Sequence, residues 1–274
     1  MTIVLIIIAI NVIFSWKGFQ DFVFFQRHKF DIDGIIVRKQ YSRLITSGFL
    51  HADYTHLIFN MFTFYMFGDA LSVIMPVSSF LLIYLGSLIG GNLLALYVHR
   101  NHGDYSAIGA SGAVSGIIYA TIIIYPNILI YGFIPGWVFG IVYILYTIFG
   151  IKKQTGNIGH DAHLGGAVTG LLLTILVFSN NSNHPINYYI VAAMFIPTLA
   201  FLYLIIYHPE WMISGKIDWS NNPLSNLKKK PKDINQRRTY INREAELNQL
   251  LDKVNRIGLE NLTDAEKRRL DQLS

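Results

Sequence analysis

A serine and a histidine, each beside glycines at the start of an apolar stretch, are the residues of this chain best suited to chemistry. Ser111 lies in the tetrapeptide Gly109-Ala-Ser-Gly112, and His163 lies in Ala162-His-Leu-Gly-Gly166. A reactive polar group inside a membrane costs several kcal/mol unless it faces a partner or a water-filled cavity. The pair therefore predicts an intramembrane active site, with Ser111 as nucleophile and His163 as base.

The neighbours of Ser111 favour this interpretation. Gly109 and Gly112 leave room for a substrate backbone, and a helix is expected to begin here. The free N–H groups and partial positive charge of a helix N-terminus would favour negative charge developing beside the hydroxyl group. The alternative is that these small residues only allow helices to pack closely, which is common in membranes.

Small residues four positions apart recur in the segments that carry Ser111 and His163. Such pairs allow two helix backbones to approach closely. If the two helices pack through these pairs, Ser111 and His163 lie at similar depth and can meet. The pairs near the predicted site are Gly112 with Gly116 and Gly166 with Gly170.

His56 and Asn60 form a second polar pair, at positions i and i+4 of an expected helix. Residues at this spacing share one helical face. Both side chains can donate hydrogen bonds toward one point, as an oxyanion formed by attack on a carbonyl requires. The alternative is a polar clamp between membrane helices, worth about 1 kcal/mol.

A third catalytic group and a metal are not indicated. Asp161 would project to nearly the opposite side of a helix from His163 and is expected at the membrane interface, and His160 is expected in a loop at the water boundary. The chain lacks the His-Glu-x-x-His pattern of helical zinc proteases. We therefore expect a dyad that uses neither a metal nor a cofactor.

Composition identifies an all-α polytopic membrane protein. Hydrophobic residues make up 52% of the 274 residues and charged residues 14%, with a mean hydropathy of +0.39. Cysteine is absent, which excludes disulfides and thiolate metal sites. The formal net charge of +5 gathers in the first loop and near the C-terminus. This distribution favours contact with membrane lipids over binding of nucleic acid.

Seven apolar segments are interpreted as membrane spans, the first being short for a bilayer. An aromatic-rich first loop between the first two spans is expected to be structured and embedded in the headgroup region, with a short soluble loop as the alternative. The segments are residues 2–15, 55–75, 77–98, 107–125, 128–149, 163–178 and 186–207.

The composition changes sharply after the last apolar segment. Residues 208–235 read as a basic linker, and residues 236–274 as a small soluble helical tail. Apolar residues at helical spacing predict one helix ending near Gly258, and Thr263 with Glu266 predicts a capping box that begins another. The tail offers no catalytic constellation, so docking, regulation or stability is its expected role.

These motifs, taken in order, resemble the rhomboid family of intramembrane serine proteases. The resemblance rests on His51 and the His56-Leu-Ile-Phe-Asn60 segment, followed by the Ser111 and His163 motifs, and it covers residues 1–180. It implies a rhomboid-like six-helix catalytic core, to which residues 186–207 add one C-terminal transmembrane helix.

The resemblance also implies a reaction, peptide hydrolysis through an acyl-enzyme in a water-accessible cavity. Ser111 would be the nucleophile and His163 the general base, with His56, Asn60 and the Ser111 backbone N–H forming the oxyanion hole. Substrates would be membrane proteins whose transmembrane helix unwinds easily near its outer end, cut after a small residue. The implied location is a bacterial plasma membrane. Substrate identity and oligomeric state stay open.

Two positions depart from the family pattern. Ser42-Arg43 replaces a Trp-Arg pair, and Ser115 replaces a tyrosine that packs on the histidine ring in many members. These departures concern substrate gating and histidine positioning. The family places the N-terminus in the cytoplasm and the first loop outside, whereas the positive-inside rule favours the reverse. We assign the membrane orientation of the six-helix core from the family pattern. The side of the membrane that carries the C-terminal tail is left open.

Two other functions compete with an active protease. A catalytically silent relative that binds membrane helices would be favoured by loss of Ser111 or His163, and both are present. A transporter would use buried histidines as a proton relay. The sequence shows neither an evident repeat nor paired discontinuous helices, so a transporter ranks last.

Overall fold

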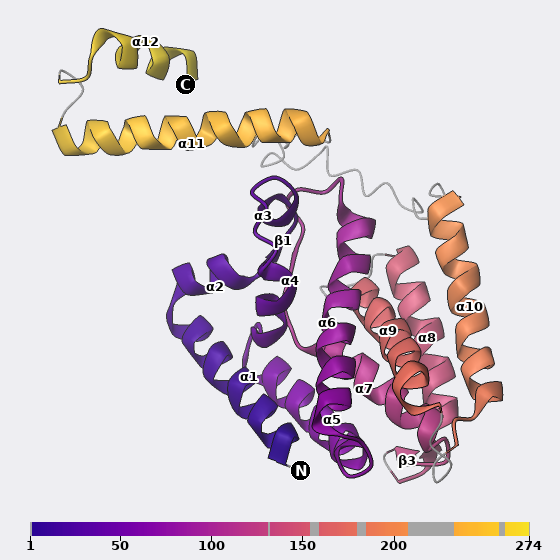
Figure 1. The fold of residues 1–274 in the computed structure, drawn as a ribbon. Helices are drawn as coiled ribbons and strands as arrows, with labels where there is room; N and C mark the ends of the chain where they lie inside the picture. The colour runs from indigo at the N-terminus through magenta and orange to yellow at the C-terminus, as the bar shows by residue number, and fades with distance from the viewer. Residues whose placement is uncertain are drawn as a thin grey trace.

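The computed structural model describes residues 2–130, 132–153, 159–179, 185–207, 233–257 and 261–273, which are mostly helical (Figure 1). The long helices are α1 (Thr2–Gln20), α5 (Tyr54–Ser72), α6 (Val77–His99), α7 (Ser111–Ile124), α8 (Gly136–Lys153), α9 (His160–Phe178), α10 (Tyr188–Tyr207), α11 (Ile234–Ile257) and α12 (Asp264–Leu273). Short elements are α2 (Phe22–His28), β1 (Phe30–Asp31), α3 (Ile32–Ile36), α4 (Arg43–Thr46), the 3-10 helix η1 (Ser47–Phe49), β2 (Ser106–Ala107), β3 (Leu129–Ile130) and β4 (Ile134–Pro135).

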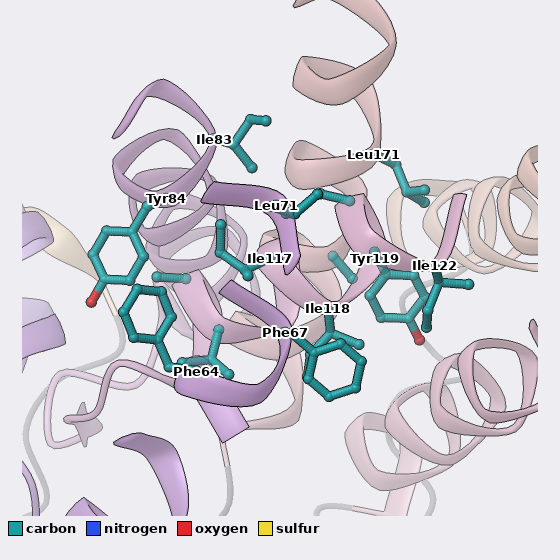
Figure 2. Packing of buried hydrophobic residues seen from close by; sticks show 14 of the residues in the cluster. Phe64, Phe67, Leu71, Ile83, Tyr84, Ile117, Ile118, Tyr119, Ile122 and Leu171 are labelled. Atoms are coloured by element: carbon teal, nitrogen blue, oxygen red, sulfur yellow. The ribbon is translucent and has the colours of Figure 1, made fainter. Parts of the chain in front are cut away.

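Helix α7 is the centre of the bundle. Every residue from Gly112 to Ile124 is buried, because α7 contacts α5, α6, α8, α9 and α10. A helix that is hydrophobic all round must be enclosed by other helices or lipid. Figure 2 shows part of the resulting core, where side chains of α5, α6 and α9 pack around Ile117 and Tyr119.

Several helices have the character of membrane spans. Among the described residues, α1, α6 and α9 are long and apolar enough to cross a membrane, and α7, α8 and α10 carry shorter apolar stretches. Helix α5 equals α1 in length, but His56, Asn60 and Asp69 lower its mean hydropathy. The fold is therefore a membrane-type helical bundle.

The first loop is structured. It contains α2, β1, α3, α4 and η1, and β1 pairs with β2 in antiparallel register, Phe30 opposite Ala107 and Asp31 opposite Ser106. Arg43 is buried and its guanidinium group donates hydrogen bonds to the Gln26 and Lys29 carbonyl oxygens at 2.8 and 2.7 Å. The loop is thus tied to the segment that leads into α7.

Two apolar segments begin before the helices that they contain. The fourth segment starts at residue 107, whereas α7 begins at Ser111, where the glycines indicated a helix start, because Gly109 has φ +126° and cannot continue a helix. The fifth was expected from residue 128, but the β3–β4 hairpin comes first and α8 begins at Gly136. Apolar strand residues extended the hydropathy signal across the turn at Gly132, whose φ is +80°.

The last apolar helix runs toward the end of the bundle that carries Ser111. The Asn187 N–H group, just before α10, donates to the Ile123 carbonyl oxygen at 3.2 Å, so α10 begins beside the C-terminal end of α7. The chain leaves α10 at the opposite end of the bundle (Figure 1). The linker that follows lies outside the described residues.

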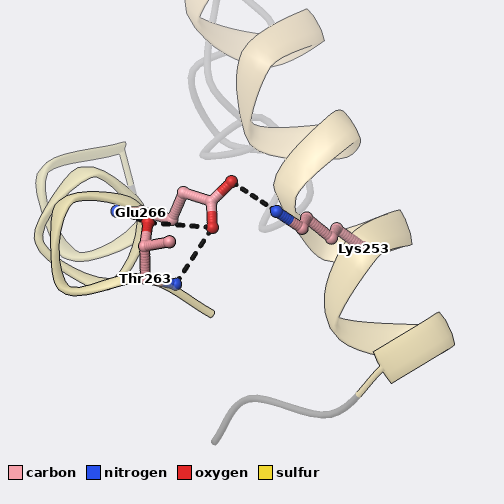
Figure 3. Close-up of polar contacts among 3 residues, drawn as sticks. All are labelled: Lys253, Thr263 and Glu266. Atoms are coloured by element: carbon pink, nitrogen blue, oxygen red, sulfur yellow. Dashed lines mark hydrogen bonds and ion pairs between the residues drawn. The ribbon is translucent and has the colours of Figure 1, made fainter. Parts of the chain in front are cut away.

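The tail forms a helical hairpin, as predicted, with a capping box at the start of α12. The Thr263 N–H donates to the Glu266 carboxylate at 3.0 Å, and the Glu266 N–H donates to Thr263 Oγ1 at 3.3 Å. Lys253 on α11 donates to the same carboxylate at 2.7 Å (Figure 3), and this contact with the Thr263 bonds lowers the pKa of Glu266 to about 2. The predicted stop at Gly258 lies outside the described residues.

Candidate active site

Ser111 lies at the first residue of the central helix. Helix α7 has 14 residues and is therefore about 21 Å long, shorter than the roughly 30 Å hydrocarbon core of a bilayer. The N-cap residue Ala110 provides no side-chain hydrogen bond, so the backbone N–H groups of the first turn stay available to a ligand. The sequence thus places a hydroxyl group beside free amide donors.

The segment before Ser111 is held by His51. This ring is fully buried between the Ser15 hydroxyl, 2.9 Å from Nδ1, and the Ala110 N–H, which donates to Nε2 at 3.5 Å. Ser15 Oγ donates its own proton to the Phe49 carbonyl oxygen and so accepts from Nδ1. Nε2 must then carry a lone pair, and His51 is neutral.

We expect acid to destabilise the fold through His51. Burial, with a smaller effect of His56, lowers the pKa of His51 from 6.5 to about 3, despite the opposing charge of Asp53. Between these values the unfolded chain binds the proton and the folded chain does not. The free energy of unfolding therefore carries no penalty from His51 above pH 6.5. It falls by about 1.4 kcal/mol per pH unit as the pH drops from 6.5 toward 3.

Thermal unfolding in detergent from pH 7.5 to pH 4.5 measures this dependence. The control is His51→Gln, which keeps an acceptor and cannot titrate, and its melting temperature should change less with pH than that of the unaltered chain. Equal slopes for both proteins would show that His51 is not the acid-sensitive group.

Helices α7 and α9 bring the backbones next to Ser111 and His163 together. A Cβ atom added to Gly112 would lie 3.2 Å from the Ala162 carbonyl oxygen, and one added to Gly116 would lie 3.0 Å from the Gly166 carbonyl oxygen. The residue after Ser111 therefore contacts the residue before His163. Ser111 Oγ and the His163 ring do not hydrogen bond in the described part of the structure.

Farther along the same contact, Gly166 and Gly170 have no room for a side chain. A Cβ atom on Gly166 would overlap the Gly112 carbonyl group, and one on Gly170 would overlap the backbone of Gly116. The four glycines thus lie where the two backbones are closest. Side chains at these positions would move α9, and His163 with it.

His56 and Asn60 border the same site from α5. A Cβ atom on Gly109 would lie 3.1 Å from His56 Nε2 and 3.6 Å from Ser111 Oγ, so the two side chains flank one space. His56 Nδ1 accepts the Ala52 N–H at 3.3 Å, which leaves the proton on Nε2 of the neutral ring. Asn60 donates one amide proton to the His56 carbonyl oxygen at 3.0 Å and keeps a second.

A cavity of about 460 Å³ lies between α5, α7, α8 and the β3–β4 hairpin. Polar groups line it at Ser111, Asn60, Ser115 and Tyr143, and the rest of its lining is largely apolar. A further cavity of about 660 Å³ lies at the other end of α5 and α7, where residues such as Val73 and Ile128 form its wall. The first cavity is the one that reaches the nucleophile.

Two residues near His163 are buried. Asp161 is buried within the protein, and its carboxylate contacts His99 Nε2 at 2.9 Å and accepts from the Tyr105 hydroxyl at 3.5 Å. His160 is not a loop residue but the buried first residue of α9, packed against Gly150. Helix α9 begins three residues earlier than expected from its apolar pattern, which explains why His160 is helical. Asp161 is thus engaged on the α6 side.

Sequence reasoning missed Tyr143, the nearest polar partner of His163. Its hydroxyl group lies 3.0 Å from His163 Nδ1, and the two rings are nearly parallel at 21°, with centroids 6.1 Å apart. A tyrosine of α8 thus stacks on the histidine although position 115 of α7 is serine. Tyr119 on α7 and Tyr146 on α8 are further tyrosines in the helices next to α9, and the spacing in the sequence does not indicate which tyrosine contacts His163.

Comparison with known proteins assigns this arrangement to a family. The model of the Rhomboid domain matches residues 38–180, and a Family of unknown function (DUF6576) matches residues 233–274. The Bacillus subtilis protein named "Putative rhomboid protease YdcA" is 35% identical over 145 residues, which are 52% of this chain and 69% of that protein.

Two further relatives match over a smaller share of their own length. Rhomboid protein 1, mitochondrial, of Saccharomyces cerevisiae is 31% identical over 47% of this chain and 40% of its own. Rhomboid protease GluP of Bacillus subtilis is 30% identical over 50% of this chain and 26% of its own. This chain therefore spans less than half of those two proteins. The chain belongs to the rhomboid family of intramembrane serine proteases.

Proposed function

We propose that this chain is an active intramembrane serine endopeptidase that hydrolyses peptide bonds in or near transmembrane helices of membrane proteins. Ser111 is the nucleophile and His163 the general base. The observation that carries the proposal is the backbone contact between Gly112 and Ala162, which supports placing the two catalytic groups side by side at the edge of a cavity.

The proposed reaction begins with attack of Ser111 Oγ on the carbonyl carbon of the scissile peptide, while His163 Nε2 takes the hydroxyl proton. The tetrahedral intermediate collapses when the protonated histidine gives this proton to the leaving amine, and an acyl-serine remains. Water then attacks the ester with the same histidine as base, which releases the acid and restores Ser111. Hydrogen bonds between nucleophile and base are often long in free enzymes and shorten when substrate binds.

The oxyanion of the intermediate needs donors that are already in position. His56 Nε2–H points toward the space beside Gly109, and Asn60 retains one amide proton. The Ser111 backbone N–H at the start of α7 is the third donor. Each donor of this kind contributes about 10²–10³-fold to kcat in serine proteases.

The cavity supports a substrate class. A helix with its side chains is about 10–12 Å across and bonds its carbonyl groups internally, so it presents no free carbonyl to a serine. The cavity, lined by apolar groups such as Phe62, Met66 and Phe139, has room for a few side chains of an extended segment. We infer substrates whose transmembrane helix unwinds near the Ser111 end.

The topology follows from the same proposal. Helices α1, α5, α6, α7, α8 and α9 form the six-helix core over residues 1–180, and α10 is the added span. The C-terminal end of α10, and with it the tail over residues 236–274, then lies on the same side of the membrane as the opening to Ser111, because α10 begins beside the C-terminal end of α7 and crosses the bundle from there. The Bacillus relatives support a bacterial plasma membrane as the location.

Labelling with a fluorophosphonate probe tests the proposal directly. We expect the purified protein in detergent to become labelled, and Ser111→Ala and His163→Ala to remain unlabelled. Ser179→Ala, at the exposed C-terminal end of α9, is the matched control and should label normally.

Size-exclusion chromatography and thermal unfolding show that each variant is folded. Labelling that persists in Ser111→Ala would assign the reactive serine elsewhere. A folded, unlabelled unaltered protein would favour a relative that binds membrane helices without cutting them.

A further inference from the structure

The hydrogen-bond partner of His163 Nδ1 suggests how the base is oriented. In many serine proteases a carboxylate holds this nitrogen and thereby fixes the tautomer of the ring. Here the Tyr143 hydroxyl occupies that place at 3.0 Å, on a ring that is stacked against the imidazole. A phenol from α8 thus stands where a carboxylate would.

The direction of this hydrogen bond decides whether His163 can act as a base. Tyr143 and Ser115, which lies one turn after Ser111 on α7, line the same cavity. When the O–H bond of the phenol turns away from the imidazole, the phenol oxygen faces His163 with its lone pairs. His163 Nδ1 must then carry the ring proton, and Nε2 keeps the lone pair that accepts the proton of Ser111.

Other polar groups around His163 are engaged in contacts of their own. Asp161 is paired with His99 and Tyr105, and the His160 ring packs edge-on against Tyr146 and lies 6.2 Å from the His163 ring. The titratable groups that face Tyr143 or His163 from packed elements are His56 on α5, Tyr119 on α7, Tyr146 on α8, and His160 and Asp161 on α9. Tyr143 is the one whose hydrogen bond to His163 Nδ1 is observed within the described residues.

We propose that Tyr143 is a positioning residue whose hydroxyl oxygen accepts the Nδ1 proton of His163 and so fixes His163 in the tautomer that a general base requires. This inference rests on the proposed function, because it assumes that His163 acts as the base. It assigns the stacking and orienting tyrosine to α8, while position 115 of α7 is serine.

Tyr143→Phe tests the inference because it removes one hydroxyl group and keeps the ring. Proton-detected ¹⁵N spectra of histidine-labelled protein report the tautomer, and His163→Gln identifies the signal. We expect the unaltered chain to show the Nδ1–H form, and Tyr143→Phe to show a mixture of both forms. The fluorophosphonate labelling rate should fall about fivefold to tenfold at saturating probe, with probe affinity unchanged, as loss of one neutral hydrogen bond predicts.

Tyr146→Phe is the matched control, since Tyr146 lies on the same helix, is 49% exposed and packs against His160. It should leave the tautomer and the labelling rate unchanged.

The outcomes separate the two proposals. If Tyr143→Phe keeps the Nδ1–H tautomer and labels at the normal rate while Ser111→Ala stays unlabelled, the positioning role is wrong and the protease proposal stands. If the unaltered protein is not labelled at all, the protease proposal fails, and the tautomer spectra still decide whether Tyr143 orients His163. Lower thermal stability of Tyr143→Phe with an unchanged tautomer would assign Tyr143 a packing role alone.

Discussion

Alanine at Ser111 is expected to lower kcat for cleavage of a transmembrane substrate by about 10⁴-fold or more, and alanine at His163 is expected to do the same. The two effects should not add. The histidine has no proton to accept once the hydroxyl group is gone, and the serine is a poor nucleophile without the base. The double variant should therefore be no slower than either single variant.

The measurement uses proteoliposomes that contain the protein and a single-span model substrate with glycine and alanine near the outer end of its helix. Cleavage is followed on gels under single-turnover conditions, which separate chemistry from product release. Ser179→Ala and His102→Ala are matched controls at exposed positions, outside the cavity. His163→Ala with more than about a tenth of normal activity would remove the histidine from the mechanism.

The sequence was informative where structure is encoded locally. Apolar runs predicted the long helices, and the glycine before Ser111 marked a place where a helix could begin. The capping box at Thr263 specified the start of α12, and its hydrogen bonds are present. These features depend on residues a few positions apart, so their consequences can be read from the chain.

The environment of the candidate base could not be read in this way. Tyr143 reaches His163 because α8 and α9 pack side by side, and no spacing in the sequence distinguishes it from Tyr146. Asp161 lies two residues from His163 and was an obvious acid to examine, yet it pairs with His99 at the end of α6. Contacts between helices depend on their rotation about their own axes, which hydropathy does not determine.

The β3–β4 hairpin shows a different limit. Leu129, Ile130 and Ile134 are apolar, so a hydropathy window joins them to α8. Gly132 and Pro135 indicate the correct start of α8, because glycine at positive φ and proline both interrupt a helix. Inside a membrane protein, turn residues are therefore better markers of helix ends than the length of an apolar run.

Alanine at Gly166 is expected to have the largest effect on folding of any single methyl group added to this bundle. A Cβ atom there would overlap the backbone carbonyl group of Gly112, which has no rotamer to move into, so α7 and α9 must separate. Overpacking of this kind typically costs about 1–3 kcal/mol, and we expect the upper end because the clash is with backbone. For a bundle of this size, that corresponds to a melting temperature lower by roughly 6–12 °C.

The separation should also abolish fluorophosphonate labelling, because Gly166 follows His163 by less than one turn and moves with it. Gly159→Ala is the matched control at the start of the same helix, where an added Cβ atom makes only ordinary contacts at 3.8 Å or longer. It should cost under about 1 kcal/mol and leave labelling intact. Normal stability and labelling in Gly166→Ala would mean that α7 and α9 are not in backbone contact, and the proposed meeting of Ser111 and His163 would lose its support.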